Sequence, residues 1–78
     1  MERALADLRH AYRSAAEGQK SCMICLESIR HARTIIDGDL SIRQILEIAE
    51  IPLSYRQVVS TGLNLSKYVE IKAEFKKV

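Results

Sequence analysis

Two cysteines and two histidines are the side chains of this chain best suited to hold a metal ion. Cys22 and Cys25 are separated by two residues, and His10 and His31 lie on either side of them. A structural zinc site would need all four as ligands, but the Cys-x2-Cys-x5-His spacing matches no common arrangement of such sites. Free cysteines behave as small hydrophobic side chains in protein cores. We therefore expect both cysteines to pack in the core, with no metal and no cofactor.

The segment DGDLS at residues 37–41 begins like a calcium-binding loop. Such a loop needs a glycine at its sixth position for a sharp turn and a bidentate glutamate at its twelfth. This chain has Ile42 and Ile48 at those two positions. The segment therefore predicts a turn between two helices and no calcium site.

No catalytic arrangement follows from the spacing of the reactive side chains. Neither histidine has a serine, a cysteine or a carboxylate at a spacing that would make it a general base, although such groups can also meet from distant segments. A chain of 78 residues also leaves little room for a substrate pocket. We expect the protein to be a binding protein and not an enzyme.

The elements that position these side chains belong to one small domain, since 78 residues with 47% hydrophobic content support a single thin core. The net charge is +2, with an acidic middle and a basic end: residues 37–50 carry four acidic side chains against Arg43, and residues 51–78 carry five basic ones against two acidic. No apolar run of about 18 residues is present to span a membrane. The N-terminus lacks the apolar centre of a signal peptide, so we expect a cytoplasmic protein.

Apolar residues recur every three or four positions along most of the chain, which is typical of amphipathic helices. We predict helices over residues 2–16, 19–36, 41–51, 55–61 and 66–77. Their predicted boundaries are turn residues and helix caps, namely Gly18, the turn at residues 37–39, Ser41, Pro52, Ser54, Gly62 and Ser66. The pattern predicts an all-α fold, a compact bundle of four or five short helices whose first two form an antiparallel hairpin.

The second predicted helix is apolar on two sides. Cys22, Cys25 and Ile29 lie on one side, whereas Ile24 and Ile35 lie on another with His31 between them. One small domain does not easily cover both sides, so we predict a protein interface at Ile24, His31 and Ile35. The hairpin at residues 1–37 would then form a homodimer, or a hetero-complex with another protein.

Residues 54–75 resemble the helix-turn-helix motif of bacterial and phage repressors. The resemblance rests on Val58 as an inward residue of a first helix, on Gly62 opening the turn, and on Leu63 as the apolar residue that packs between the two helices. Tyr68 and Ile71 occupy the inward positions of a second helix. In that motif the turn holds the second helix where its N-terminal residues reach base edges in the major groove.

The resemblance implies that this part of the domain, residues 41–77, binds double-stranded DNA. Asn64, Ser66, Lys67 and Glu70 would approach the bases. The implied phosphate contacts are basic side chains, namely Arg56, Lys72, Lys76 and Lys77. The resulting hypothesis is a small transcriptional regulator. The alternative is a helical protein-interaction module, such as an adaptor, a chaperone-like protein or an inhibitor, that docks a partner through an apolar helix face.

Overall fold

The computed structural model describes residues 1–71, which form five α-helices and one short 3-10 helix without any strand. The elements are α1 (Glu2–Ser14), α2 (Lys20–Arg30), α3 (Ala32–Asp37), α4 (Ile42–Ala49), η1 (Leu53–Tyr55) and α5 (Arg56–Leu65). The predicted all-α class is confirmed. Within the described part of the chain, no helix has the length and apolarity needed to cross a membrane.

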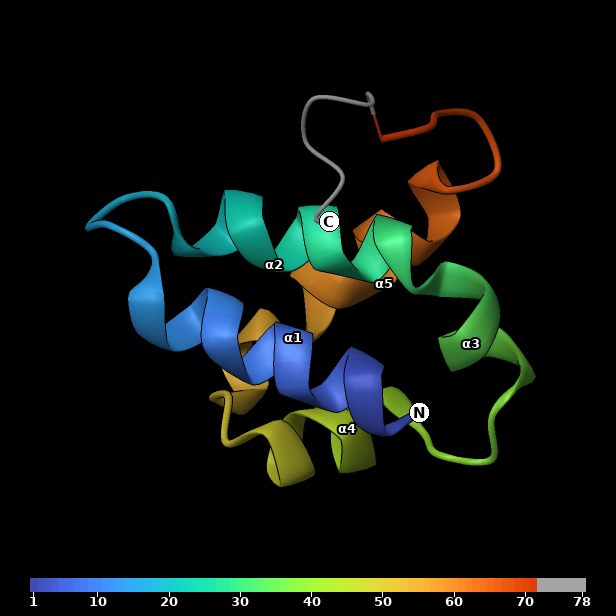
Figure 1. The fold of residues 1–78 in the computed structure, drawn as a ribbon, viewed down its shortest axis with the longest axis horizontal. Coiled ribbons are helices and arrows are strands. Elements are labelled where there is room, and N and C mark those ends of the chain that lie inside the picture. Colours follow the sequence, from blue (N-terminus) through green and yellow to red (C-terminus); the bar gives the residue numbers. More distant parts are fainter. Residues whose placement is uncertain (72–78) are drawn as a thin grey trace.

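Helices α1 and α2 lie beside each other and run in opposite directions, so the predicted N-terminal hairpin is confirmed (Figure 1). Helix α4 packs against α1, and α5 crosses behind α2 in the view of Figure 1. The shared core contains Leu8, Ile24, Ile45, Leu46 and Val59, all of them fully buried. Each such side chain contributes about 1.5–3 kcal/mol relative to exposure. The longer helices therefore position one another through one buried cluster.

The predicted apolar docking face at Ile24, His31 and Ile35 is wrong for both isoleucines. Ile24 is 0% exposed and Ile35 is 4% exposed, and both belong to the central core cluster. Their side of the chain is covered within one protomer because α2 packs against both α1 and α5. The apolar surface from which we predicted a dimer or hetero-complex is therefore used internally, and the oligomeric state stays a prediction.

The cysteine prediction is also partly wrong, since Cys22 is exposed and Cys25 is half-buried. Both line a shallow apolar groove between α2 and α5, beside Val58 and Thr61. Neither residue is part of the buried core cluster.

The helix predicted over residues 19–36 is interrupted at His31, where φ is −103° and ψ is 17°. The His31 N–H still donates to the Glu27 carbonyl at 3.0 Å, and the Ile35 N–H donates to the His31 carbonyl at 2.9 Å. The chain therefore bends between α2 and α3 while its hydrogen bonds continue. The bend leaves the spacing of the apolar side chains almost unchanged, so apolar periodicity does not reveal it.

Gly62 does not open a turn, contrary to our prediction, because it lies inside α5. A Cβ atom on Gly62 would lie 2.7 Å from the Ser28 Cβ and 2.9 Å from the Cys25 carbonyl oxygen. Both distances are shorter than real Cβ atoms tolerate. Gly62 is needed because α5 and α2 cross at this point without room for a side chain.

The predicted helix over residues 66–77 is absent over its described part, residues 66–71. Ser66 ends α5, and its hydroxyl donates to the Leu63 carbonyl at 2.6 Å. Tyr68 is 82% exposed, so its predicted inward position is wrong. The rest of that predicted helix lies outside the described residues.

Candidate nucleic-acid interface

The helix pair α4–α5 is joined by a tight turn that begins at Glu50. Helix α4 starts with a capping box: the Gln44 N–H donates to the Ser41 hydroxyl at 3.2 Å, and the Ser41 N–H donates to the Gln44 side chain at 2.9 Å. It ends at Glu50, whose backbone is left-handed with φ 62° and ψ 40°. Glycine usually occupies such a position. Ser41 and Asp39 were both predicted as possible caps of this helix, and the structure uses Ser41.

Ile51, which follows Glu50 in the turn, holds the two helices together. The Ile51 N–H donates to the Leu46 carbonyl at 2.9 Å, and the Ile51 side chain is buried in the core cluster. Pro52 then prevents α4 from continuing. The chain enters η1 and α5 immediately afterwards, so α4 and α5 form two consecutive helices around a compact turn.

Two arginines of α1 bind the C-terminal end of α4. The Arg9 guanidinium donates to the Ile48 carbonyl at 2.7 Å, and the Arg13 guanidinium forms an ion pair with the Glu50 carboxylate. Cations are favourable at this end of a helix because its last carbonyl groups are unpaired and carry negative partial charge. Helix α1 therefore supports the turn of the α4–α5 pair.

Helix α5 has a buried side and a polar side. Val59 and Gly62 are buried against the rest of the bundle. Gln57, Thr61 and Asn64 are all exposed and follow one another at spacings of four and three residues, so they share one face. This face borders α2, because Gln57 and Thr61 line the groove that contains the two cysteines. We call these three residues the polar stripe. Arg56, the first residue of α5, is the only charged residue of this helix, and it is exposed.

Comparison with families of known proteins gives a match for the domain as a whole. The profile that describes an HTH-like domain matches residues 1–72 of the 78. The chain belongs to the HTH-like domain family. No curated protein and no solved structure matches the chain. The predicted resemblance to helix-turn-helix proteins is confirmed, whereas the predicted position of the turn at Gly62 is wrong.

The residues predicted to contact DNA are divided between the two ends of α5. Arg56 begins the helix, while Asn64, Ser66, Lys67 and Glu70 lie at or beyond its C-terminal end. All of them are exposed except Ser66, which is half-buried and hydrogen-bonded to Leu63. The predicted phosphate contacts that follow lie outside the described residues, namely Lys72, Lys76 and Lys77.

Sequence reasoning missed two members of the polar stripe, Gln57 and Thr61. Their signal was present, because Gln57, Thr61 and Asn64 have helical spacing and alternate with the apolar residues of α5. Because we predicted that the helix ends before Gly62, Asn64 was assigned to a different element from Gln57 and Thr61. A glycine that permits close helix packing thus concealed a continuous polar face.

Proposed function

We propose that this HTH-like domain protein is a small, non-enzymatic DNA-binding protein whose recognition helix is α5. The observation that carries the proposal is the polar stripe, Gln57, Thr61 and Asn64, exposed on the helix that follows the tight turn at Glu50. In helix-turn-helix proteins the second helix enters the major groove. The family membership supports DNA binding by a helix-turn-helix in general.

The side-chain chemistry of the polar stripe suits base edges. Glutamine and asparagine can pair bidentately with adenine, and threonine can contact several bases through its hydroxyl and methyl groups. Residues 57 and 64 are separated by about 10 Å along the helix axis, given a rise of about 1.5 Å per residue. That length corresponds to roughly three base-pair steps of about 3.4 Å.

Basic side chains at the two ends of α5 and on α4 are our candidates for phosphate contacts. Arg56 lies at the start of α5, Lys67 lies just beyond its end, and Arg43 is exposed on α4. Arg43 has a long contact to Glu47 of 3.7 Å between two exposed side chains. A phosphate can replace such a surface partner because exposed ion pairs contribute little stability.

The proposal is tested by fluorescence anisotropy of a random-sequence duplex at about 50 and 200 mM salt, followed by selection of preferred sequences. We expect binding that weakens strongly at the higher salt. Arg56→Ala should weaken binding to all sequences and reduce the salt slope by about one. Gln57→Ala and Asn64→Ala should reduce the preference for the selected sequence, by about 1–3 kcal/mol for each bidentate contact.

Gln19→Ala is the matched control for the polar stripe. It removes an exposed amide from the residue before α2, where no side-chain cap hydrogen bond is made. We expect this variant to bind DNA like the wild type. If the wild type does not bind at about 50 mM salt, the proposal is wrong, and a protein partner becomes the better hypothesis.

A role in transcription and a homodimeric state belong to the same proposal. One recognition helix contacts only a few base pairs, so high specificity usually needs two half-sites about 34–36 Å apart. The mass of the protein with and without a selected duplex, measured by analytical ultracentrifugation, tests this expectation. A single copy on every selected site would contradict it.

A further inference from the structure

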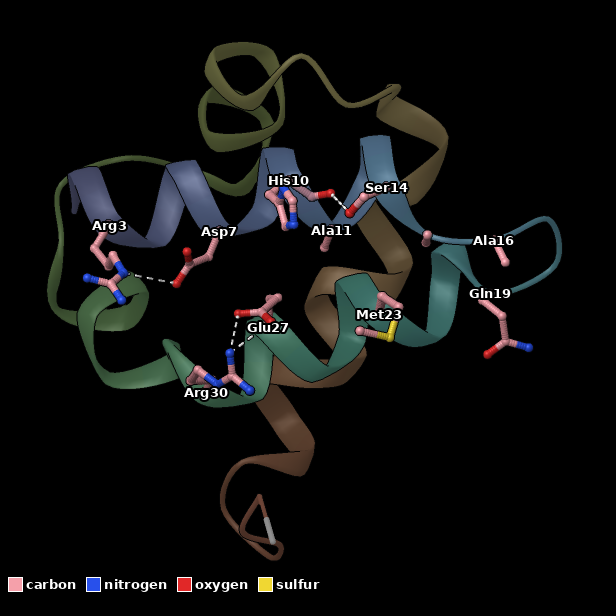
Figure 2. A pocket seen from close by; sticks show the side chains of 11 residues that line it. Arg3, Asp7, His10, Ala11, Ser14, Ala16, Gln19, Met23, Glu27 and Arg30 are labelled. Atoms are coloured by element: carbon pink, nitrogen blue, oxygen red, sulfur yellow. Dashed lines mark hydrogen bonds and ion pairs between the residues drawn. The ribbon is translucent and has the colours of Figure 1, made fainter. Parts of the chain in front are cut away.

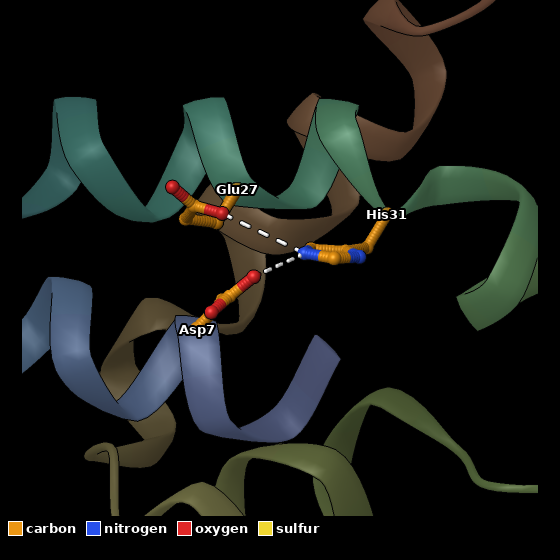
Figure 3. A group of neighbouring side chains, drawn as sticks. All are labelled: Asp7, Glu27 and His31. Carbon is orange, nitrogen blue, oxygen red and sulfur yellow. Dashed lines mark hydrogen bonds and ion pairs between the residues drawn. The ribbon is translucent and has the colours of Figure 1, made fainter. Parts of the chain in front are cut away.

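Three potential metal ligands meet where α1 faces the junction of α2 and α3. They are Asp7 of α1, Glu27 of α2 and His31 at the bend (Figure 3). The His31 Nε2 atom lies 2.8 Å from the Asp7 Oδ2 atom and 3.7 Å from the Glu27 Oε1 atom. One ligand atom from each residue lies within 4.8 Å of the other two. We call this group the DEH cluster.

The spacing of these atoms is close to that of a tetrahedral metal site. Zinc bonds to nitrogen and oxygen are about 2.1 Å long, which places neighbouring ligand atoms about 3.4 Å apart. The two measured distances lie on either side of that value. Small side-chain movements would therefore bring all three atoms to a common ion, which would replace the hydrogen bond between His31 and Asp7.

Two members of the DEH cluster, Asp7 and Glu27, line a groove that gives access to solvent and room for a fourth ligand. It has a volume of about 490 Å³ and runs between α1 and α2, with Asp7 and Glu27 facing each other across it (Figure 2). His10 and Met23 also line it. A water molecule in the groove could complete the coordination of an ion, as in zinc sites with three protein ligands.

The charges around the cluster are compatible with a bound cation. Arg30 contacts both oxygens of the Glu27 carboxylate, Oε2 at 3.0 Å and Oε1 at 3.2 Å. It can keep its contact with Oε2 and orient the carboxylate while Oε1 binds the ion. Arg3 contacts Asp7 at 3.5 Å, but its side chain is 78% exposed and can move into solvent.

We propose that Asp7, Glu27 and His31 bind a divalent transition-metal ion of the zinc class in the groove between α1 and α2. One imidazole nitrogen and two carboxylate oxygens suit such ions, whereas magnesium and calcium prefer oxygen ligands alone. The site connects α1 to the bend after α2. It is independent of the proposed DNA contact, since none of its ligands belongs to the polar stripe.

The test is a titration of the reduced, metal-free full-length protein with Co²⁺, followed by visible absorption, and displacement of the cobalt by Zn²⁺. We expect one equivalent to bind with absorption bands typical of a four- or five-coordinate site, and Zn²⁺ to raise the melting temperature. Asp7→Asn and His31→Gln should each weaken binding about tenfold or more. Asp7→Asn nearly preserves side-chain size, and circular dichroism checks that both variants fold.

Two further variants test whether side chains outside the DEH cluster bind the cobalt ion. His10→Gln removes an exposed histidine of the same groove that lies outside the DEH cluster, and we expect it to bind cobalt like the wild type. Cys22→Ser should also have no effect. Thiolate-to-cobalt charge-transfer bands, an equal loss in His10→Gln and His31→Gln, or unchanged affinity in Asp7→Asn would each overturn the proposal.

Discussion

Helix α2 contacts its two main neighbours in different ways. Against α1 it leaves a groove of about 490 Å³ that contains charged side chains, among them Asp7 and Glu27. Against α5 it packs so closely that Gly62 has no space for a methyl group. The α2–α5 contact is therefore determined by shape, and the α1–α2 contact depends partly on charge. Only the α1–α2 contact should respond strongly to pH or to ions.

The largest effect should come from Gly62→Ala, which places a methyl group in the α2–α5 contact. Overpacking of this kind costs about 1–3 kcal/mol and outweighs the gain of up to about 1 kcal/mol from replacing a glycine within a helix. Urea unfolding monitored by circular dichroism measures the loss. Unchanged stability would show that the two helices are not held at the observed distance.

Gly38→Ala is the control for this comparison. There the new Cβ would meet the Met1 Cε atom at 2.6 Å, the end of a flexible side chain, and the Thr34 carbonyl at 3.1 Å. We expect a smaller loss of stability than for Gly62→Ala, because Met1 can move away. In a double-mutant cycle, Ser28→Gly should cost less stability in the Gly62→Ala background than in the wild type, since it removes the nearer contact atom.

The α1–α2 contact is tested by the pH dependence of Glu27→Gln. Because burial raises the pKa of the folded Glu27 carboxyl above its unfolded value of 4.5, folding favours the protonated form. The contribution of this group to stability is therefore fully present below pH 4.5 and is lost as pH rises through the folded pKa. The unfolding free energy of the variant should increase relative to wild type over that range.

Unfolding in urea at several pH values between about 4 and 7 measures this difference. Glu17→Gln, which removes an exposed carboxylate outside the groove, controls for the loss of one negative charge. If the unfolding free energy of Glu17→Gln, relative to wild type, rises with pH as steeply as that of Glu27→Gln, burial of Glu27 is not the cause. Gly62→Ala should instead lower stability by a similar amount throughout the range.

The smallest effect should come from Ser28→Ala at the α2–α5 contact. The Ser28 hydroxyl donates to the Ile24 carbonyl at 2.9 Å within the same helix. That carbonyl lies inside α2, and such local bonds add little to helix stability. We expect a change within about 0.5 kcal/mol, because the variant keeps the Cβ atom that contacts α5. A loss comparable to that of Gly62→Ala would mean that the hydroxyl, and not shape, holds this contact.

Local chemistry made much of the fold predictable. Apolar spacing identified an all-helical chain, and Ser41 and Pro52 marked the ends of the region that contains α4. Both residues act through their own backbone or the next turn, so no knowledge of distant segments was needed. The antiparallel hairpin followed from two helical segments joined by the loop that contains Gly18.

The errors concern residues whose role depends on a distant partner. A glycine suits either a turn or a close helix crossing, and only the positions of Cys25 and Ser28 distinguish the two for Gly62. Ile24 and Ile35 appeared to require an external partner because the sequence does not show that α5 crosses α2. Asp7 was not predicted as a site residue because its partner His31 lies on another element.

Under the proposed function, the close crossing at Gly62 also has a consequence for DNA specificity. The two helices touch there almost backbone to backbone, and the start of α5 at Arg56 lies about 9 Å away along the helix axis. A small rotation about such a pivot moves the two ends of α5 in opposite directions. For a helix that contacts bases, substitutions at positions 28 or 62 that preserve folding would redirect the polar stripe without altering it. Under the proposed function, family members with identical polar stripes would then differ in the DNA sequence that they prefer.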